Sequence, residues 1–514
     1  MTRPRAELLR NALVRLKEGN FDEVLKLAGP LRAANADDVE AGLFFGLAAA
    51  ATGQPETAAS ALAHVADLRP DAPHPALDVI GVLTPRREHD AIARYVDAAV
   101  AHTPDDLRLL AVAGAWLQQT GQGSRARSLL ERVVAAQPDL SPPQIALAAV
   151  DAEAGAFDAA ITRLRGVLAR DPRNAAALAN LGAMLGVLNR FDEAEACFVR
   201  ARGLAPNRIQ IAINHGIARL KSGRLSDGWP DLNRRLQQPG HALLPANTLL
   251  QPLAADARLD GRIVLVTHDS GFGDTLQFAR YLPMLRQRGA RVLLWVPKPL
   301  HRLLAPMAEV FSDNRAWPRF DAHCPIIRLA EVFATTLETI PAETPYLHAD
   351  PDRVAHWRHR LPDDGRRRVG IAWAGSTRDS NPELRSVDQR RSLDPAVLAP
   401  LFALEGVQWV NLQLGRPPPH AGMIDLMPDV QDFADTAGIV ASLDAVVSVD
   451  TSVVHLAGGL GKTVLLLDRM DNCWRWLSDR TDSPWYPALT IVRQTRWGDW
   501  SGPVDEVAGI LSAS

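Results

Sequence analysis

The sequence predicts a fold in two parts: an all-α solenoid of helical repeats, followed by an α/β region with two parallel sheets. Three observations support this. Prolines recur every 34 residues in the first half, short apolar runs alternate with helical patterns in the second, and ten of the twelve Trp residues lie after residue 240. The 514 residues suffice for roughly two to four domains. The predicted boundaries are 1–240 for the solenoid, and 241–362 and 363–514 for the two α/β units.

The composition is that of a folded protein without a charge bias. Apolar residues make up 47% and charged residues 22% of the chain, and 56 basic against 59 acidic side chains give a net charge of −3. A strongly basic nucleic-acid binder is therefore excluded. The three cysteines, Cys197, Cys324 and Cys473, are far apart and form no CxxC pair, so neither a zinc cluster nor a disulfide framework is predicted.

No targeting or membrane segment is predicted. The first seven residues are charged and lack an apolar core, which argues against a signal peptide. No apolar stretch is long enough to span a bilayer. We expect a cytoplasmic protein without a transmembrane segment.

The repeats of the first half have a period of 34 residues. The prolines in register are Pro70, Pro104, Pro138, Pro172 and Pro206. Small residues recur in the same register at Gly46, Gly114, Ala148, Gly182 and Gly216, and a second glycine series comprises Gly53, Gly121, Gly155 and Gly223. Small residues let paired helices approach closely, glycine ends the first helix of a pair, and proline stops the second.

The period predicts six helix pairs and a final pair. Their ranges are 5–38, 39–72, 73–106, 107–140, 141–174, 175–208 and 209–238. The 73–106 unit is degenerate, because Ile80, Arg87 and Ile92 replace its consensus small residues. The pattern resembles the tetratricopeptide repeat. Such solenoids present a concave face to a peptide or protein, so we expect a partner there; a structural spacer or a dimerisation surface is the alternative.

The second half alternates predicted strands and helices. A strand over 263–267 is followed by a glycine-rich turn and a helix over 275–288. Further strands are predicted at 292–296, 369–373, 409–412, 445–449, 463–467 and 489–492. Such alternation is typical of parallel sheets covered by helices. Two units of this kind leave a cleft, and ligands of open parallel sheets bind beyond the carboxyl ends of the strands.

Two strand-to-helix turns stand out at those ends. One is the run from Gly271 to Thr275; the other follows the strand that ends at Val449. In the second turn Asp450, Thr451 and Ser452 supply groups that cap a helix N-terminus. The free amides and dipole of that N-terminus favour an anion such as a diphosphate. His455 lies one helical turn further on; the alternative is a plain capped helix with the histidine buried in the interior.

Other phosphate and metal motifs are excluded. Gly461-Lys462-Thr463 leads from a helix into a strand, the reverse of a phosphate-binding loop. The Gly271 turn lacks the third glycine of a dinucleotide fingerprint. Asp350-Pro351-Asp352 resembles a metal-binding DxD, but the proline and the helical pattern after it indicate a helix start. Neither a metal site nor a cofactor is predicted.

The second half resembles the glycosyltransferase domain of bacterial proteins with tetratricopeptide repeats. That family is similar to the heptosyltransferases of lipopolysaccharide synthesis and, more remotely, to O-GlcNAc transferases. The segments that carry the resemblance are 271–283 (GFGDTLQFARYLP), 369–375 (VGIAWAG), 391–393 (RSL), 449–458 (VDTSVVHLAG), 474–476 (WRW) and 483–487 (SPWYP). The resemblance implies a GT-B fold, two Rossmann-like domains with a nucleotide-sugar donor between them, and an enzyme that needs no metal.

The resemblance also implies roles for single residues. Asp274 corresponds to the general base that takes the proton of the acceptor hydroxyl; a helix N-cap at Thr275 is the alternative. Arg391 corresponds to a basic group that neutralises the leaving nucleotide diphosphate; a solvated arginine in a run with Arg385 and Arg390 is the alternative. The residues predicted to bind the donor are Gly271, Gly273, Arg391, Gln413, Asp450, Thr451, Ser452 and His455.

Two segments depart from the family pattern. Asp269-Ser270 stands where the family commonly has Glu-Gln, and residues 468–473 replace an aliphatic-Pro segment. The leading hypothesis is transfer of a sugar from a nucleotide-sugar to a protein held by the repeats, which the resemblance extends to flagellin or another surface protein. A transferase for lipopolysaccharide or polysaccharide is one alternative, and an inactive scaffold that binds partners is another.

Overall fold

The computed structural model describes residues 4–238, 241, 243–312, 317–375 and 387–513. Contacts between Cα atoms divide these residues into two compact units, one within Met1–Pro172 and one formed by Arg173–Thr377 and Val387–Ser514. The division falls inside the repeats, whereas the predicted boundary at residue 240 marks the change from paired helices to strands. The three predicted domains stay a prediction.

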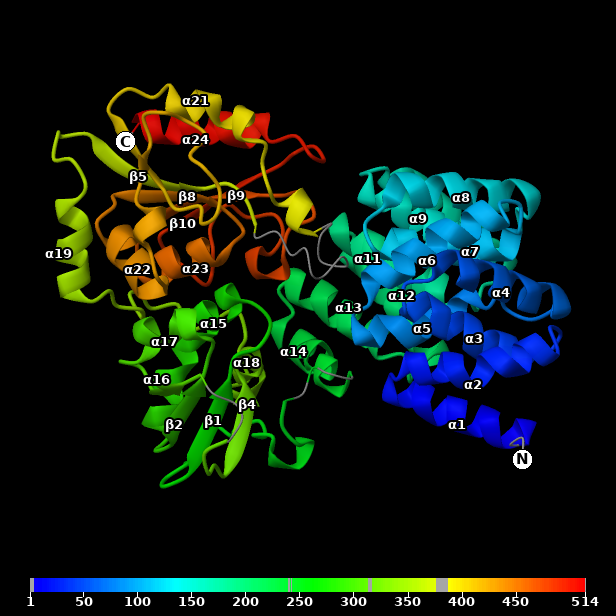
Figure 1. The fold of residues 1–514 in the computed structure, drawn as a ribbon. Coiled ribbons are helices and arrows are strands. Elements are labelled where there is room, and N and C mark those ends of the chain that lie inside the picture. Colours follow the sequence, from blue (N-terminus) through cyan, green and yellow to red (C-terminus); the bar gives the residue numbers. More distant parts are fainter. Residues whose placement is uncertain (1–3, 239–240, 242, 313–316, 376–386, 514) are drawn as a thin grey trace. The chain divides into compact units, whose positions relative to one another are not determined.

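The first unit consists of helix pairs in the predicted register (Figure 1). Its helices are α1 (Arg5–Glu18), α2 (Phe21–Ala34), α3 (Val39–Ala51), α4 (Pro55–Leu68), α5 (Ala76–Leu83), α6 (His89–His102), α7 (Leu107–Gln119), α8 (Gly123–Ala136), α9 (Ser141–Glu153) and α10 (Phe157–Arg170). Their shared core is built largely from small and aliphatic side chains of the repeats themselves. The solenoid prediction is therefore confirmed for this unit.

The repeat that is degenerate in sequence also differs from its neighbours in structure. Gly53, in the turn between α3 and α4, has a φ of 78°, which glycine adopts without strain. In the degenerate repeat Arg87 occupies the corresponding turn with a φ of 62°. Its first helix, α5, has only 8 residues and continues into a 3-10 turn, Thr84–Arg86. Loss of the consensus small residues thus coincides with a shortened helix.

The second unit begins with the last two helix pairs. They are α11 (Ala175–Val187), α12 (Phe191–Leu204), α13 (Ile209–Lys221) and α14 (Leu225–Asn233). The final pair packs into the core of the α/β region: Trp229 is 1% exposed and lies edge-on to Trp474, with 5.3 Å between ring centroids. Its indole Nε1 donates a 2.9 Å hydrogen bond to the carbonyl oxygen of Thr335. The last repeat is therefore part of the α/β core.

Next comes a four-stranded parallel sheet. Its strands are β1 (Ile263–Thr267), β2 (Arg291–Trp295), β3 (Glu309–Phe311) and β4 (Ala322–Pro325), in the order β3-β2-β1-β4. The helices of this region are α15 (Phe272–Phe278), α16 (Leu282–Gln287), α17 (Lys298–Leu304), α18 (Leu329–Val332) and α19 (Pro351–His359). The order of strands reverses between β1 and β4, which places a crevice at their carboxyl ends.

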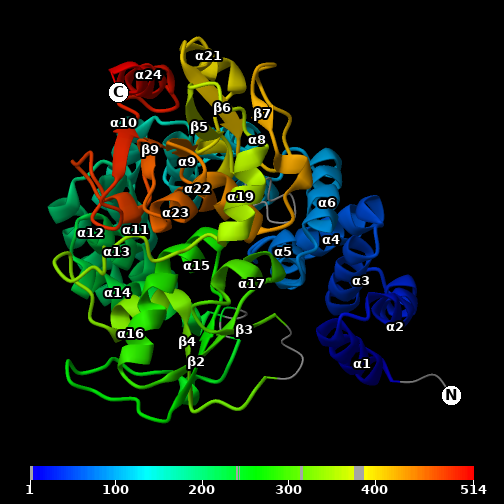
Figure 2. The same ribbon diagram turned by 90° about the vertical axis from the view of Figure 1, so that its left-hand side faces the viewer.

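A six-stranded parallel sheet completes the chain. Its strands are β5 (Arg367–Ala372), β6 (Val407–Asn411), β7 (Ile424–Asp425), β8 (Ala445–Val449), β9 (Thr463–Asp468) and β10 (Leu489–Arg493), in the order β10-β9-β8-β5-β6-β7. Helices α21 (Ala399–Phe402) and α24 (Ser501–Ala513) cover one face, and α22 (Phe433–Ala441) and α23 (Ser452–Gly459) the other (Figures 1 and 2). The α/β prediction with two parallel sheets is confirmed.

The strands bury both faces, but in different cores. Val447 and Leu465 point into a core under α21 and α24. Val446 and Leu466, one residue away along the same strands, point into the core that continues to the four-stranded sheet and α14. This alternation follows from the two-residue period of a strand. It puts α22 and α23 on the side of the sheet that faces α15 and α17 (Figure 1).

Several boundaries differ from the predicted ones. The helix predicted over 275–288 begins at Phe272 and is interrupted by a 3-10 turn, Ala279–Tyr281. The strands β3, β4 and β7 were not predicted; they have 3, 4 and 2 residues, too few for a visible pattern. Asp350 caps α19, as predicted for a helix start. Within the described residues, no helix is long and apolar enough to cross a membrane.

Candidate functional site

The N-terminal turns of α15 and α23 meet between the two sheets. α15 follows β1 and α23 follows β8, and the two helices are in contact (Figure 1). The contact depends on Gly273, because a Cβ there would lie 2.7 Å from Cδ2 of His455 and 3.5 Å from Cα of Ser452. The structure therefore brings the predicted residues of the two strand-to-helix turns together, although they are far apart in the sequence.

Asp274 is held at this junction by two partners. One carboxylate oxygen accepts a 2.8 Å hydrogen bond from the backbone N–H of Gly271, and the other contacts a guanidinium nitrogen of Arg475. The side chain of Asp274 is 17% exposed. The capping alternative therefore describes a real contact, made to Gly271 rather than at Thr275. A carboxylate offers about four lone-pair sites in all, so these two bonds do not occupy every one of them.

Arg475 is a site residue to which the sequence argument assigned no role. It belongs to the 3-10 turn Trp474–Trp476 after β9. Its Nε donates to Oε1 of Gln277 at 2.6 Å, its Nη1 lies 3.0 Å from Sγ of Cys473, and its guanidinium lies 4.3 Å from the Trp474 ring centre. Burial lowers the pKa of Arg475, but Asp274, Cys473 and Asp450 outweigh burial and raise it. Arg475 is a permanent cation beside the candidate base.

His455 is buried and neutral. Its Nδ1 lies 2.8 Å from the hydroxyl of Tyr486, and its ring stacks on Trp476 with 5.5 Å between centroids. Burial, followed by the charges of Arg475, Arg280 and Arg391, holds its pKa well below the usual range. The bond to Tyr486 is what the interior alternative expects. A contact between His455 and a donor stays a prediction.

Thr451 and Arg391 border the N-terminus of α23. Thr451 is the N-cap, and its hydroxyl oxygen accepts from the N–H of Val453 at 3.3 Å. Arg391 donates from Nη1 to the backbone oxygen of Asp450 at 3.0 Å and pairs with Asp388. Its side chain is 17% exposed, so it is not solvated. Arg390 pairs with Asp471 at 3.1 Å, and Arg385 lies outside the described residues.

Gln413 has a structural contact that the sequence did not predict. It follows β6 and is buried, and its Oε1 accepts from the backbone N–H groups of Trp373 at 3.2 Å and Ala374 at 2.9 Å. It thereby ties the end of β6 to the end of β5. Its predicted contact with the donor is untested.

Arginines compensate the acidic residues of the two unusual segments. Asp269 pairs with Arg235, which follows α14. Asp468 is fully buried at the end of β9 and pairs with Arg493 at 2.8 Å. Burial raises the pKa of Asp468 to about 7 even so. Each of the two departures from the family pattern therefore places an aspartate against an arginine, partly buried at Asp269 and fully buried at Asp468.

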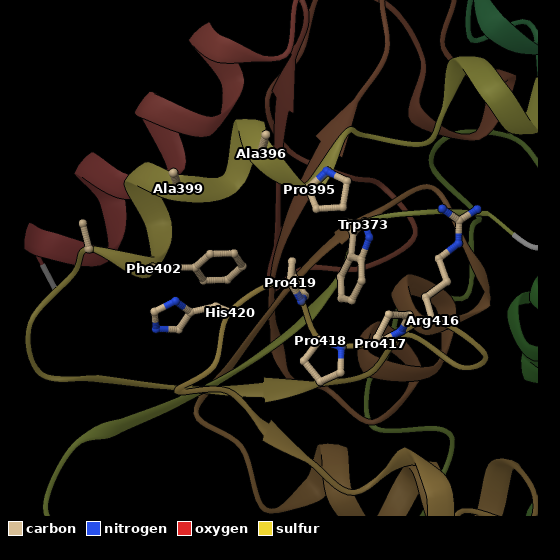
Figure 3. A pocket seen from close by; sticks show the side chains of 11 residues that line it. Trp373, Pro395, Ala396, Ala399, Phe402, Arg416, Pro417, Pro418, Pro419 and His420 are labelled. Carbon is tan, nitrogen blue, oxygen red and sulfur yellow. The ribbon is translucent and has the colours of Figure 1, made fainter.

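Two pockets lie in the second unit, one beside the Asp274 turn and one apart from it. One, of about 50 Å³, is lined at the carboxyl ends of β1 and β4 by Thr267, His268, Asp269, His323 and Pro325, beside the Asp274 turn. The other, of about 910 Å³, is open and lined by Trp373, Phe402, His420 and a run of prolines, 417–419 (Figure 3). None of the predicted site residues lines the larger pocket. The described residues contain no group of three or more His, Cys, Asp or Glu side chains that could hold a metal ion.

Comparisons with known proteins match one segment of the repeats and one relative along most of the chain. A family model of the tetratricopeptide repeat matches residues 151–213. Protein FlbA of Caulobacter vibrioides is 24% identical over 539 aligned positions, which cover 97% of this chain and 83% of the relative.

Solved structures also resemble parts of the chain. A glycosyl transferase of family 9 from Veillonella parvula is 11% identical, covers 47% of this chain and 88% of its own, and has a TM-score of 0.35. The ADP-heptose lipopolysaccharide heptosyltransferase II of Escherichia coli is 15% identical, with coverages of 49% and 97% and a TM-score of 0.35. A mutant O-GlcNAc transferase from Thermobaculum terrenum is 15% identical, with coverages of 79% and 89% and a TM-score of 0.29. The chain itself joins tetratricopeptide repeats to two parallel α/β sheets, the architecture that the sequence resemblance implied.

Proposed function

We propose that this chain is a glycosyltransferase that moves a sugar from a nucleotide-sugar donor to an acceptor hydroxyl. One observation carries the proposal: the candidate base on α15 and the N-terminus of α23 come from different sheets and lie in contact. A base and an anion-binding helix end thereby face the same small region. This is the arrangement that a displacement at a sugar–phosphate bond requires.

The chemistry balances with the groups present. The acceptor oxygen attacks the anomeric carbon and forms the new glycosidic bond, while its proton passes to the carboxylate of Asp274. The bond between the anomeric carbon and the phosphate oxygen breaks, and the nucleotide leaves with the electron pair. Amides at the N-terminus of α23 and the guanidinium of Arg391 are placed to stabilise the negative charge that develops on the leaving group.

The remaining features of the proposal come from the resemblance. We propose that the reaction needs no metal, because Arg391 and the helix end take the place of a cation at the phosphates. We also propose that the acceptor is a protein bound by the repeats, flagellin or another surface protein in the family's pattern. A lipopolysaccharide or polysaccharide acceptor is the second candidate, and an inactive partner-binding scaffold the third.

The test begins with donor binding. The purified full chain is screened by thermal shift against UDP-, GDP-, ADP- and CMP-sugars, because a ligand that binds only the folded state raises its stability. Nucleotide release from any donor that binds is then measured with and without EDTA. Asp274→Asn is expected to reduce release about 10²- to 10⁴-fold, the usual contribution of a general base, without loss of donor binding. Asp363→Asn, at a residue that is 97% exposed, is the matched control.

Each outcome decides between the candidates. If no nucleotide-sugar shifts the melting temperature, the proposal of an enzyme is wrong and the hypothesis of an inactive scaffold replaces it. Unchanged release by Asp274→Asn removes Asp274 as the base, and loss of release with EDTA removes the proposed independence from metal. Label from the donor that appears in protease-sensitive material supports a protein acceptor, and label in protease-resistant glycan supports the polysaccharide alternative.

A further inference from the structure

Arg475 links the candidate base to the candidate phosphate site. Its guanidinium contacts Asp274 on α15, and the ring of Trp476, the next residue, stacks on His455 of α23 with 5.5 Å between centroids. Arg391 donates to the backbone oxygen of Asp450, the residue before Thr451. Two arginines therefore flank the N-terminus of α23, and one of them is engaged with the base.

The hydrogen bonds of Arg475 are unequal. Asp274 and Gln277 offer oxygen acceptors, whereas the acceptor that Nη1 has among the described residues is the sulfur of Cys473 at 3.0 Å. Thiol sulfur is a weak acceptor, whereas phosphate oxygens form strong, often bidentate bonds with arginine. A phosphate that reaches this side of the guanidinium offers it a better partner than the one it has.

We infer that Asp274 and the phosphate of a nucleotide-sugar donor compete for the guanidinium of Arg475, so that Arg475 couples donor binding to the readiness of the base. The inference rests on the proposed function and goes beyond it. A carboxylate paired with a buried arginine is a poor proton acceptor, because protonation would leave the guanidinium charge without its partner. Transfer of Arg475 to the phosphate frees Asp274 for the acceptor hydroxyl and favours a sequence in which the donor binds first.

The inference predicts a competition that can be measured without an acceptor. Asp274 and the phosphate share one guanidinium, so neutralising the carboxylate should make Arg475 more available. Asp274→Asn, which keeps the shape of the side chain, is expected to tighten binding of the probe nucleotide about five- to tenfold, a size typical of coupling between neighbouring charges. In an Arg475→Gln background the same substitution is expected to have no effect.

The experiment is a double-mutant cycle on the full chain. Calorimetric titrations with UDP, GDP, ADP and CMP compare the unmodified protein, Asp274→Asn, Arg475→Gln and the double variant. Arg302→Gln is the matched control: Arg302 on α17 pairs with Asp432 and Asp435, so its loss breaks an ion pair to α22 without touching Asp274. It is expected to leave nucleotide affinity unchanged.

The outcomes separate this inference from the proposed function. If the unmodified protein binds none of the nucleotides, the proposed function falls and the inference with it. If it binds one but Asp274→Asn gives equal or weaker affinity, the switch is wrong and the proposed function stands. If Arg475→Gln does not fold, Arg475→Lys replaces it in the cycle, because lysine keeps the charge but lacks the planar fork that can be shared between two anions; an undiminished gain from Asp274→Asn in that background shows that the switch is wrong. Equal gains with and without Arg475 would likewise overturn the inference, because they would come from direct repulsion between Asp274 and the phosphate.

Discussion

The two ends of the repeat array use one sequence pattern to build different interiors. In the first unit the helix pairs form a core among themselves, with Leu62, Tyr95 and Leu130 fully buried. In the second unit the final pair, α13 and α14, contributes Ile213, Leu220 and Trp229 to the core that also holds β1 and β8. The 34-residue register thus sets how helices pair but not what the pair packs against.

The difference shows how the repeats and the α/β region are joined. A large aromatic side chain appears where the last pair has to fill space beside sheet helices, as Trp229 does against Phe278 and Trp485, 6.2 Å and 6.4 Å away between centroids. In the first unit the shared core is rich in alanine, and its large aromatic side chains, Tyr95 and Trp116, lie among helices alone. The last repeat is therefore best regarded as part of the proposed catalytic region.

The largest expected effect tests this assignment. Trp229→Ala is expected to destabilise the second unit by about 3–5 kcal/mol, the cost of truncating a buried Trp, and to leave the Thr335 carbonyl without its hydrogen-bond donor. Trp116→Ala, at a residue 5% exposed in the core of the first unit, is expected to cost a similar amount there. Hydrogen–deuterium exchange followed by peptide locates each loss.

Two results would contradict the assignment of the last pair to the α/β core. One is that Trp229→Ala raises exchange in α1–α10 and leaves β1 and β8 protected. The other is that Trp116→Ala and Trp229→Ala reduce the thermal shift caused by a nucleotide to the same extent.

A smaller expected effect is a loss of stability of the first unit when the pH is lowered, and it depends on His74. Burial lowers the pKa of His74 to about 4. Its Nδ1 accepts the N–H of Ala76 at 3.1 Å, so a proton on that nitrogen would break the bond, and its Nε2 is 4.0 Å from Asp106, too far for a hydrogen bond. Between pH 6.5 and 4 the unfolded chain binds more protons at this residue than the folded chain.

The difference in bound protons sets the sign and size of the effect on the free energy of unfolding. The stabilisation that the first unit has with His74 neutral is fully present above pH 6.5 and is lost as the pH falls toward 4. We expect the free energy of unfolding to fall by about 2 kcal/mol between pH 7 and pH 5. His74→Asn keeps an acceptor for Ala76 and does not titrate, so it should remove most of this dependence. The measurement is exchange in α5–α7 peptides at both pH values, corrected for the intrinsic rate. A variant as acid-sensitive as the unmodified protein would assign the effect to another group.

The parts of this fold that the sequence predicts are those fixed by local periodicity. The helix pairs follow from the proline and glycine registers, and β1 and β8 begin and end at the predicted residues because each is a compact apolar run between polar turns. The strands β3 and β7 escape prediction because two or three residues carry no period. Helix α15 begins earlier than predicted because Gly271 and Phe272 enter its first turn.

Prediction of the site has a different limit. The turns that carry Asp274 and Thr451 were found through their positions after strands, which is a local signal, whereas the role of Asp274 was implied by the family resemblance. Arg475 was not assigned a role because its importance lies in contacts with Asp274 and Gln277, about two hundred positions away in the sequence. The pairs of Asp269 with Arg235 and of Asp468 with Arg493 were missed because they also join residues that are not neighbours in the sequence. Two arginine partners, Arg235 and Arg493, belong to segments that give no sign of a site.

The smallest expected effect on stability comes from replacing a glycine by alanine at a close contact between helices. Such a glycine occurs in each unit, Gly114 in the first and Gly273 in the second. A Cβ at Gly114 would lie 2.6 Å from Cγ of Leu130, and one at Gly273 would lie 2.7 Å from Cδ2 of His455. Overpacking costs about 1–3 kcal/mol, but alanine in a helix interior regains about 1 kcal/mol over glycine. Gly114→Ala is therefore expected to cost about 1 kcal/mol, because Gly114 lies inside α7 and the aliphatic side chain of Leu130 can rotate about its Cα–Cβ bond to relieve part of the contact.

Gly273→Ala is expected to reduce nucleotide affinity more than it reduces the free energy of unfolding. The ring of His455 is fixed by Tyr486 and Trp476 and cannot yield as Leu130 can. The added methyl group must instead push α15 away from α23, which separates Asp274 from the phosphate site. We expect nucleotide affinity to fall about tenfold or more for Gly273→Ala, since small displacements of positioned groups are costly, and to stay unchanged for Gly114→Ala. Equal affinities for the two variants would show that the α15–α23 contact is structural, because a site built across it would feel the added methyl group directly.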